Sequence, residues 1–556
     1  MSTDLEIAAS ATPRPIEEIA ENLGIAKDDL DLYGKFKAKL PLKLIDRETL
    51  NQSKLILVSA ISPTPAGEGK TTISIGLAQG LNRIGKPTTV VLREPSLGPV
   101  FGVKGGATGG GYSQVLPMED INLHFTGDFA AIEKAHNLLA ALIDNNIQSK
   151  QNSLGIDPRT VNWKRVFDMN DRALRDIVIG LGGTSSGIPR ETGFDITAAS
   201  EIMAILCLSD DLHDLKRRLG NIFVGFTFGE KPIYARDLNV NGAMTVLLKD
   251  AIKPNLVQTL EGTPAIIHGG PFANIAQGTN TVIATRMGMS LSDYVVTEAG
   301  FGFDLGAEKF FDIKCASAGL SPAAVVLVAT VRALRYHGGA DLKSIHDPNP
   351  EAVEAGLSNL EKHLDNMEHF GMACVVAINK FTTDTPAEIE IIKERCTSLG
   401  IVAIETDSWA RGGEGAEALA RSLVEIVDQG SSTFRPLYQW DWTLERKIET
   451  IAKEIYGARA IDYTAKAKKD RRTNKKLKLE GLPICMAKTE KSLSDDPGLL
   501  GRPKDFVVTV REIQIASGAG FLIPITGEIM RMPGLPPKPA AESIDIDAEG
   551  NVVGLF

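Results

Sequence analysis

The sequence predicts an α/β protein built around a mostly parallel sheet. Short apolar runs of strand length alternate with longer stretches of helical periodicity, which is the pattern of parallel strands joined by crossover helices. The 53 glycines and 28 prolines fall between these runs, where turns are expected. The chain has 556 residues, of which 43% are hydrophobic. Because a single hydrophobic core stops growing at about 250–300 residues, we expect more than one packed unit.

Charge and cysteine content exclude several classes of protein. The 60 Lys and Arg residues against 70 Asp and Glu give a net charge of −10, so the surface repels polyanions and we expect no nucleic-acid partner. The five cysteines lie far apart without a C-x-x-C pair, which fits a reducing compartment better than a zinc cage or a disulfide framework. Met1–Pro15 is polar and acidic, and the chain has no run of about 18 apolar residues. We therefore expect a cytoplasmic protein with no membrane partner.

Eight apolar runs are candidates for buried strands. Most of them end in Gly, Asn, Thr or a charged residue. In an open α/β sheet the carboxyl ends of the strands line the ligand crevice, so these terminal polar residues are the first candidates for chemistry. The runs are Lys54–Ile61, Thr88–Leu92, Ile177–Gly180, Ala265–His268, Tyr294–Thr297, Ala324–Ala329, Ala373–Ile378 and Ile401–Ile404.

The chain divides into three predicted units. A large α/β domain covers residues 1–360, and two smaller α/β or α+β units cover 361–431 and 432–556. The last boundary follows from a change in composition, because an aromatic, Pro-containing segment at Arg435–Trp442 precedes a helical stretch at Leu444–Tyr456.

A basic segment follows at Lys466–Lys478. Such a run could attract nucleic acid or another polyanionic ligand. A run of this kind more often forms the solvated face of a helix, which is the structure we expect here.

The first predicted strand, Lys54–Ile61, runs directly into S-P-T-P-A-G-E-G-K-T-T at positions 62–72. An amphipathic helix follows, with Ile73, Leu77 and Leu81 on its apolar face. A strand, loop and helix of this kind aim free backbone N–H groups and the positive helix end at a polyphosphate. The sequence therefore predicts that the large domain is P-loop NTPase-like and binds ATP.

The residues of this loop supply the predicted nucleotide contacts. Lys70 can reach the β- and γ-phosphates, and the hydroxyl of either Thr71 or Thr72 can ligate Mg²⁺. The loop departs from G-x-x-x-x-G-K-[ST], because Thr64 occupies the first Gly position, so the turn entering the loop must differ. The alternative is a Gly/Pro turn that carries a Lys by chance. The predicted ATP contacts are Thr64, Pro65, Ala66, Gly67, Glu68, Gly69, Lys70, Thr71 and Thr72.

A second cation follows the next predicted strand. Thr88–Leu92 ends in Arg93, Glu94 and Pro95. Consecutive strands of this kind usually lie side by side, so Arg93 should sit next to the loop. A planar, permanently charged guanidinium suits a transferring phosphoryl group or a small carboxylate. The alternative is a surface ion pair between Arg93 and Glu94.

A glycine-rich segment comes next, at positions 98–112. Seven glycines fall within 98–111, which is too many for a helix or a strand and costs too much entropy for a passive connector. Apolar and aromatic residues are interleaved with these glycines, unlike in a flexible linker. We therefore predict a backbone-lined ligand loop, with Gly105 and Gly106 as substrate contacts.

This segment closely resembles the first signature of the formate–tetrahydrofolate ligases, with the sequence G-V-K-G-G-A-T-G-G-G-Y starting at Gly102. Their second signature is similar to V-A-T-V-R-A-L-R-Y-H-G-G at Val328–Gly339. Further family motifs extend from the nucleotide loop to M-P-G-L-P at Met532–Pro536, so the resemblance covers essentially the whole chain. The length matches the single-function form of the enzyme. Two departures, Thr108 and Arg335, remove no donor that the chemistry requires.

The resemblance implies ATP-dependent ligation of formate to tetrahydrofolate, which gives 10-formyltetrahydrofolate, ADP and phosphate by way of formyl phosphate. The reaction then has two steps, the phosphorylation of formate by ATP and the attack of the folate amine on formyl phosphate. Both steps require negative oxygens to be neutralised and reactants to be held in line. We expect Lys70 to act on the β/γ-phosphates, and Arg93 on formate and then on the formyl phosphate anion. The resemblance also implies a homotetramer that needs Mg²⁺ and is stimulated by a monovalent cation.

Two carboxylates, Asp128 and Glu94, are candidates for accepting the proton of the attacking amine. Either could instead organise a cation site or cap a helix. The family usually carries His two residues after this Asp, whereas Ala130 stands here, which argues against an essential acid–base role for that His. The neighbouring His124 and His136 are interpreted as structural.

The pterin ring of the folate requires a flat slot, and aromatic side chains supply stacking area at low entropic cost. By resemblance, Phe381 and Trp409 sandwich the pterin. Both follow predicted strands, Ala373–Ile378 and Ile401–Ile404. Phe301, in another loop after a predicted strand, is a further candidate for a planar substrate contact.

Two other functions are compatible with the nucleotide loop. The closest enzyme alternative is another P-loop ligase that phosphorylates a different small carboxylate. The non-enzyme alternative is a partitioning-type ATPase switch, whose loop also carries G-K-T-T. A switch would need a partner surface and has no use for two aromatic slot residues.

Overall fold

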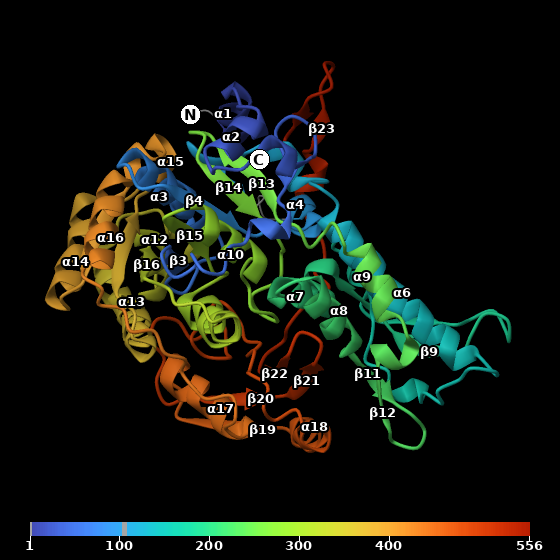
Figure 1. The fold of residues 1–556 in the computed structure, drawn as a ribbon. Helices are drawn as coiled ribbons and strands as arrows, with labels where there is room; N and C mark the ends of the chain where they lie inside the picture. The colour runs from blue at the N-terminus through green and yellow to red at the C-terminus, as the bar shows by residue number, and fades with distance from the viewer. Residues whose placement is uncertain (1–2, 103–107, 556) are drawn as a thin grey trace.

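The computed structural model describes residues 3–102 and 108–555, and one large sheet forms its centre (Figure 1). From β14 to β18 every pair of neighbouring strands is parallel, which confirms the predicted mostly parallel α/β fold. The hairpin of β5 (Gly109–Gly110) and β6 (Ser113–Leu116) attaches beside β13. In spatial order the strands are β1 (Asp31–Leu32), β2 (Ala38–Lys39), β13 (Asn255–Thr259), β14 (Pro264–Ile267), β4 (Thr88–Leu92), β15 (Tyr294–Glu298), β3 (Lys54–Ala60), β16 (Ala324–Ala329), β17 (Cys374–Asn379) and β18 (Val402–Thr406).

Helices cover both faces of this sheet, because the side chains of its strands alternate between two hydrophobic cores. In β3, Leu55 and Leu57 point into one core, whereas Ile56 and Val58 point into the other. The first core holds α10 (Val282–Leu291), α12 (Val331–His337), α13 (Pro350–Phe370) and α14 (Pro386–Ser398). The second core holds α3 (Lys70–Arg83) and α16 (Glu417–Asp428), and α15 (Ser408–Arg411) contacts α3.

A separate hydrophobic core lies beside the sheet and is built from the chain between β6 and β13 (Figure 1). Part of the C-terminal segment packs against it, because Phe521 and Ile523 of β22 (Phe521–Ile525) belong to the same core. Its helices are α6 (Asp128–Gln148), α7 (Glu201–Leu208), α8 (Leu212–Gly220) and α9 (Asn241–Leu247). Short strands around it are β7 (Arg165–Phe167), β8 (Ile177–Ile179), β9 (Arg190–Thr192), β10 (Phe194–Ile196), β11 (Phe223–Phe226) and β12 (Pro232–Tyr234).

The C-terminal segment combines helices with two-stranded sheets. The predicted helix at Leu444–Tyr456 forms as α17 and a following π-helical turn, and the basic segment forms α18. Several basic side chains of α18 pair with acids, as in Arg471–Glu445 at 2.9 Å, which matches the expected solvated helix face. The elements are α17 (Leu444–Thr450), β19 (Ala460–Tyr463), α18 (Ala465–Lys476), β20 (Val507–Val510), β21 (Glu512–Ala516), β22 (Phe521–Ile525), β23 (Asp545–Ile546) and β24 (Val552–Val553).

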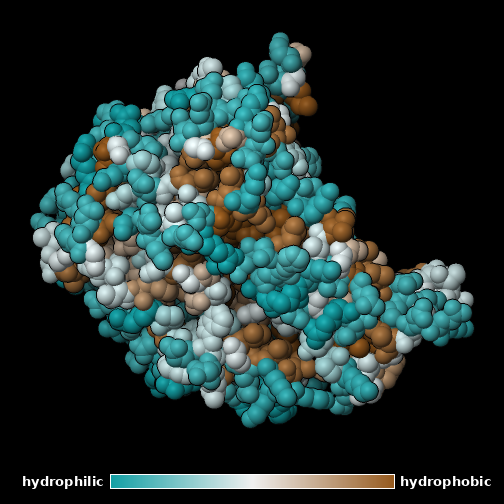
Figure 2. Space-filling view, in the orientation of Figure 1, coloured by the Kyte–Doolittle hydropathy of each residue, from teal (hydrophilic) through white to brown (hydrophobic). Residues whose placement is uncertain are grey.

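The remaining helices are short. They are α1 (Asp4–Ser10), α2 (Ile16–Glu21), α4 (Leu97–Phe101), α5 (Met118–Asn122) and the single turn α11 (Ala316–Ala318). Figure 2 shows that hydrophilic residues cover most of this face of the molecule, while hydrophobic residues gather in hollows over its centre. Within residues 3–102 and 108–555, no helix is both long and apolar enough to span a bilayer.

Three details differ from the sequence-based expectations. The run Ile177–Gly180 is not a strand of the central sheet, because β8 pairs only with β9 and Val178 is 57% exposed; three β-branched residues give the same local signal in a projecting hairpin as in a sheet core. β3 and β4 are not neighbours, because β15 lies between them. The glycine-rich segment is not wholly irregular, since it includes α4 and β5.

The predicted division into three units remains a prediction. β17 and β18 belong to the range 361–431, yet they extend the same sheet as the strands of the range 1–360. The first of the two boundaries, after residue 360, therefore falls inside α13, the helix that connects the neighbouring strands β16 and β17.

Candidate active site

The predicted nucleotide loop connects the carboxyl end of β3 to α3. Gly67 and Gly69 both adopt positive φ, of 78° and 73°, and Lys70 opens the helix with a half-buried side chain. A Cβ atom on Gly69 would lie 2.4 Å from Nδ2 of Asn379, at the end of β17. Only glycine allows the loop to approach this neighbouring strand so closely.

Glu68 holds the loop closed from within. Its side chain is 1% exposed, and Oε1 accepts hydrogen bonds from the N–H of Thr64 at 2.7 Å and from the Thr64 hydroxyl at 2.8 Å. Oε2 accepts a hydrogen bond from the hydroxyl of Thr330. The threonine at the usual first Gly position therefore supplies two donors to a carboxylate of the same loop, which explains the departure from the common pattern.

Residues after the ends of the two adjoining strands support the loop from outside. Nη2 of Arg332 donates to the carbonyl of Gly67 at 2.6 Å, and Nδ2 of Asn379 donates to the carbonyl of Glu68 at 3.1 Å. The loop is thus fixed by β16, β17 and α12 before any substrate binds.

The entry to the loop is held by the second signature as well. Nε2 of His337 lies 2.9 Å from the carbonyl of Ser62, and the N–H of Gly501 donates to Nδ1 of the same ring at 3.2 Å. His337 is therefore a neutral imidazole with its proton on Nε2. Burial lowers the pKa of His337 to about 4.

Arg93 follows the end of β4 and lies at the same edge as the loop, although β15 separates their strands. The connection is Glu298, the last residue of β15, which is 3% exposed. Its Oε2 accepts a hydrogen bond from the Thr71 hydroxyl at 2.9 Å, and its Oε1 lies 4.0 Å from Nη2 of Arg93. Nη1 of Arg93 also donates to the carbonyl of Pro271 at 3.2 Å. The two oxygens of one carboxylate thus bring the loop and Arg93 together.

Thr71 and Glu298 form an oxygen pair of the kind that Mg²⁺ prefers. A hydroxyl and a carboxylate are hard ligands, and Mg²⁺ usually takes one or two carboxylates together with substrate phosphates. The donor set at this edge therefore fits a Mg²⁺ ion that accompanies a nucleotide, and it favours Thr71 over Thr72 as the hydroxyl ligand.

Glu94 is buried next to Arg93, and its Oε2 has no hydrogen-bond partner among the described residues. Burial raises the pKa of Glu94 well above its usual range, and the nearby charge of Asp128 raises it further, while Lys39 opposes the shift. Glu94 faces a mostly apolar cavity of about 260 Å³. Ala130, at the position where the family resemblance leads us to expect His, lines the same cavity.

Asp128 has a different environment. The residue is 2% exposed, its Oδ1 lies 2.7 Å from Nζ of the equally buried Lys39, and its Oδ2 accepts a hydrogen bond from Asn255 at 2.8 Å. Both oxygens are therefore engaged, which favours the structural interpretation of Asp128 over a role in accepting a proton.

The aromatic residues predicted for the pterin slot lie after adjacent strands. Phe381 follows β17, and the guanidinium of Arg332 lies 4.7 Å from the centre of its ring. Trp409 follows β18 and contacts the glycine-rich segment, since its carbonyl accepts the N–H of Tyr112 at 2.8 Å. A Cβ on Gly111 would lie 2.0 Å from this carbonyl, and the φ of Gly111 is +58°, so glycine is required there.

Phe301 has a positive φ of 59°, a conformation that costs a non-glycine residue energy and often marks a functional site. It adjoins Gly300, where an added Cβ would lie 3.1 Å from Nη1 of Arg93. Gly105 and Gly106 lie outside the described residues.

The predicted structural histidines differ from each other. His136 is buried, stacks on Trp163 at 4.1 Å and contacts the hydroxyl of Ser200; burial lowers its pKa to about 3. This packing agrees with a structural role. His124 is exposed and lines the cavity beside Glu94.

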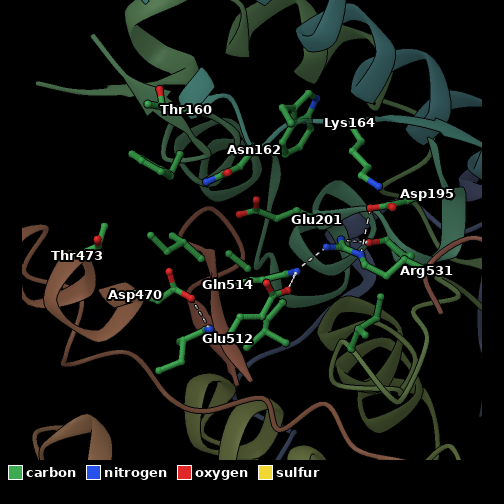
Figure 3. A pocket seen from close by; sticks show the side chains of 18 of the residues that line it. Thr160, Asn162, Lys164, Asp195, Glu201, Asp470, Thr473, Glu512, Gln514 and Arg531 are labelled. Carbon is green, nitrogen blue, oxygen red and sulfur yellow. Dashed lines mark hydrogen bonds and ion pairs between the residues drawn. The ribbon is translucent and has the colours of Figure 1, made fainter. Parts of the chain in front are cut away.

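A larger cavity, of about 910 Å³, lies between the separate core and the C-terminal segment (Figure 3). Its charged side chains largely neutralise one another. Arg531 contacts Asp195 at 3.1 Å and donates to Gln514 at 2.6 Å, and Gln514 in turn donates to Glu512 at 2.7 Å. None of the predicted site residues that the structure describes lines this cavity. The largest of the described cavities is therefore not the one at the sheet edge.

Four contributors to the site are not among the residues predicted from the sequence. They are Glu298, Thr330, Arg332 and Asn379, and each ends a strand of the sheet or follows one within three residues. Polar residues at strand ends were the available signal. What the sequence could not show is which strands are neighbours, and therefore which of these side chains meet.

The strand ends, the loop with its lysine and the adjoining guanidinium together have the layout of an α/β enzyme site that handles anionic substrates. A family model described as formate–tetrahydrofolate ligase matches residues 2–556. The chain belongs to this family. It is therefore an ATP-dependent carbon–nitrogen ligase that joins formate to tetrahydrofolate, and the match leaves no support for the ATPase-switch alternative.

Proposed function

We propose that the ligation takes place at the carboxyl edge of the central sheet, where Lys70 and Arg93 act on the same phosphoryl group. The observation that carries this proposal is the position of Glu298, which contacts both the loop residue Thr71 and Arg93. Because one carboxylate reaches both partners, the γ-phosphate of ATP and a formate ion can be bound next to each other at this edge.

In the first step a formate oxygen attacks the γ-phosphorus in line, the bond to the β–γ bridging oxygen breaks, and ADP leaves. Lys70 and the loop N–H groups neutralise the β- and γ-oxygens, and Arg93 holds formate and then the formyl phosphate anion. Thr71 and Glu298 would hold a Mg²⁺ ion that accompanies the nucleotide, and such an ion would supply further charge neutralisation.

In the second step the aryl amine of tetrahydrofolate attacks the formyl carbon, and the carbon–oxygen bond to phosphate breaks. The amine nitrogen loses one proton, and Glu94 accepts it through its unpartnered Oε2. Because burial raises the pKa of Glu94, this carboxyl is a strong base only once it is ionised. Turnover should therefore fall as the pH drops below that raised value.

The pterin is bound between Phe381 and Trp409, with Phe301 near the reacting end. Support comes from their positions after β17, β18 and β15, on the same sheet edge as the loop. By the family resemblance we further propose a cytoplasmic homotetramer, stimulated by a monovalent cation and able to accept polyglutamylated folates.

The formyl phosphate route is tested with formate labelled with ¹⁸O. The formate oxygen that attacks phosphorus stays with phosphate when the carbon–oxygen bond breaks. We expect one labelled oxygen in each phosphate released, and only when ATP and tetrahydrofolate are both present. Unlabelled phosphate would show that formate is not phosphorylated.

A further inference from the structure

The second signature, at Val328–Gly339, includes one side chain that contacts both halves of the proposed site. Arg332 lies in α12, directly after β16. In the sheet, β16 lies between β3, which leads to the nucleotide loop, and β17, which leads to Phe381. A long side chain from this position is therefore able to reach both neighbours.

Arg332 contacts each of them. Nη2 donates to the carbonyl of Gly67, in the nucleotide loop, at 2.6 Å. The centre of the guanidinium lies 4.7 Å from the centre of the Phe381 ring. A guanidinium can do both at once, because it presents N–H donors in its plane and attracts an aromatic ring through its face.

The loop side of this arrangement is rigid. Glu68, next to Gly67, is hydrogen-bonded to Thr64 and Thr330. The position of the Gly67 carbonyl therefore depends on the position of the whole loop. The ring side is less constrained, since Phe381 is only half-buried. Nε of Arg332 is buried and has no hydrogen-bond partner within the part of the chain that the structure describes, whereas Nη2 is held by the carbonyl of Gly67.

We propose that Arg332 is a positioning residue that couples nucleotide binding to folate binding. Because the hydrogen bond and the ring contact already exist in the structure, phosphates bound to the loop act by restricting its remaining motion. Through the Gly67 carbonyl they also restrict the motion of the guanidinium and of the Phe381 ring. By thermodynamic linkage, folate binding strengthens nucleotide binding by the same factor. This inference rests on the proposed role of Phe381 in the pterin slot.

The test is the affinity for tetrahydrofolate, measured by calorimetry with and without a saturating non-hydrolysable ATP analogue. We expect the analogue to tighten folate binding in the parent protein by about fivefold or more. In Arg332→Met this factor should fall to about one, and in Arg332→Lys, which keeps a donor but loses the planar face, it should fall at least in part. The matched control is Arg395→Lys, because Arg395 pairs with Glu361 on the surface of α14, away from both contacts.

The outcomes separate this inference from the proposed site. If Phe381→Leu leaves the folate affinity unchanged, the pterin slot itself is wrong. If Phe381→Leu weakens folate binding while both Arg332 variants keep the parent's coupling factor, only the role of Arg332 is wrong. A parent protein that binds folate equally well with and without the analogue would also overturn it. Should Arg332→Met fail to fold, the Lys variant decides alone.

Discussion

Both carboxylate oxygens of Glu68 are hydrogen-bonded. By contrast, Nε of Arg93 and Oε2 of Glu94, at the same sheet edge, have no hydrogen-bond partner in residues 3–102 and 108–555. The nucleotide loop is held by residues from the ends of β16 and β17 and from α12, so its geometry exists before ATP arrives. The side with Arg93 and Glu94 keeps buried polar atoms unpaired, at a cost of about 1–3 kcal/mol each. The difference indicates that the loop is preorganised for phosphate, while the other side reserves its hydrogen-bonding capacity for the small acid and the amine.

The largest effect is expected where the loop meets the reacting phosphoryl group. Lys70→Ala should lower turnover by about 10²–10³-fold or more, because a fixed charge on the transferring group is lost. The thermal midpoint should change little, since Lys70 is only half-buried at the start of α3. Steady-state kinetics and thermal unfolding measure the two quantities. Normal turnover in this variant would refute the phosphate assignment.

The framework of the loop should be less sensitive than its lysine. Glu68→Gln replaces a charged acceptor of three hydrogen bonds with an amide, and hydrogen bonds to charged groups contribute about 1.5–3 kcal/mol. We expect the KM for ATP to rise about tenfold, which corresponds to 1.4 kcal/mol, and the folate KM to change less. Glu361→Gln, which alters a surface ion pair, is the control. An unchanged ATP KM would show that ATP binding does not depend on the three hydrogen bonds that Glu68 accepts.

The aromatic side of the site gives a smaller and more selective effect. Trp409→Ala should raise the folate KM about fivefold or more and leave the ATP KM nearly unchanged, because stacking contributes about 0.5–1.5 kcal/mol beyond the area buried. Trp442→Ala is a matched control, since Trp442 stacks on Arg446 in the C-terminal segment. Equal increases in the folate KM and the ATP KM would show that Trp409 does not line the pterin slot.

The two sides of the site are also expected to differ in how acid changes the free energy of unfolding. The entry to the nucleotide loop, held by His337, is the first case. The pKa of His337 falls from 6.5 to about 4 on burial, so the unfolded chain binds the proton first, and this group's stabilising contribution is lost as the pH falls from 6.5 towards 4. The loss is at most about 1.4 kcal/mol per pH unit. His337→Asn should therefore show a shallower decline in unfolding free energy over this range than the parent. Identical slopes would mean that the ring is already protonated in the folded protein.

On the side of Arg93 and Glu94, the effect of acid on the free energy of unfolding has the opposite sign. Burial raises the pKa of Asp168, which lines the cavity with Glu94, from 3.8 to about 6. The folded protein binds this proton more tightly than the unfolded chain, so acidification from pH 6 to 3.8 favours folding through this group.

Much of this architecture follows from local sequence signals. Seven apolar runs became strands of the sheet because long β-branched stretches between turns have few other stable structures, and the loop was recognisable from its glycines and lysine. The order of strands was not, because no local signal encodes that β15 lies between β3 and β4. For the same reason the contacts of Glu298 and Arg332, which depend on neighbouring strands, became visible only in the folded chain.

The central claim is that Arg93 and Lys70 act on one group, and formate-dependent ADP release by Arg93→Ala tests it most directly. The account predicts that this variant binds ATP as tightly as the parent in calorimetry, while formate no longer accelerates ADP release in the presence of tetrahydrofolate. Formate stimulation equal to that of the parent would contradict the claim, because Arg93 would then have no part in holding the acid.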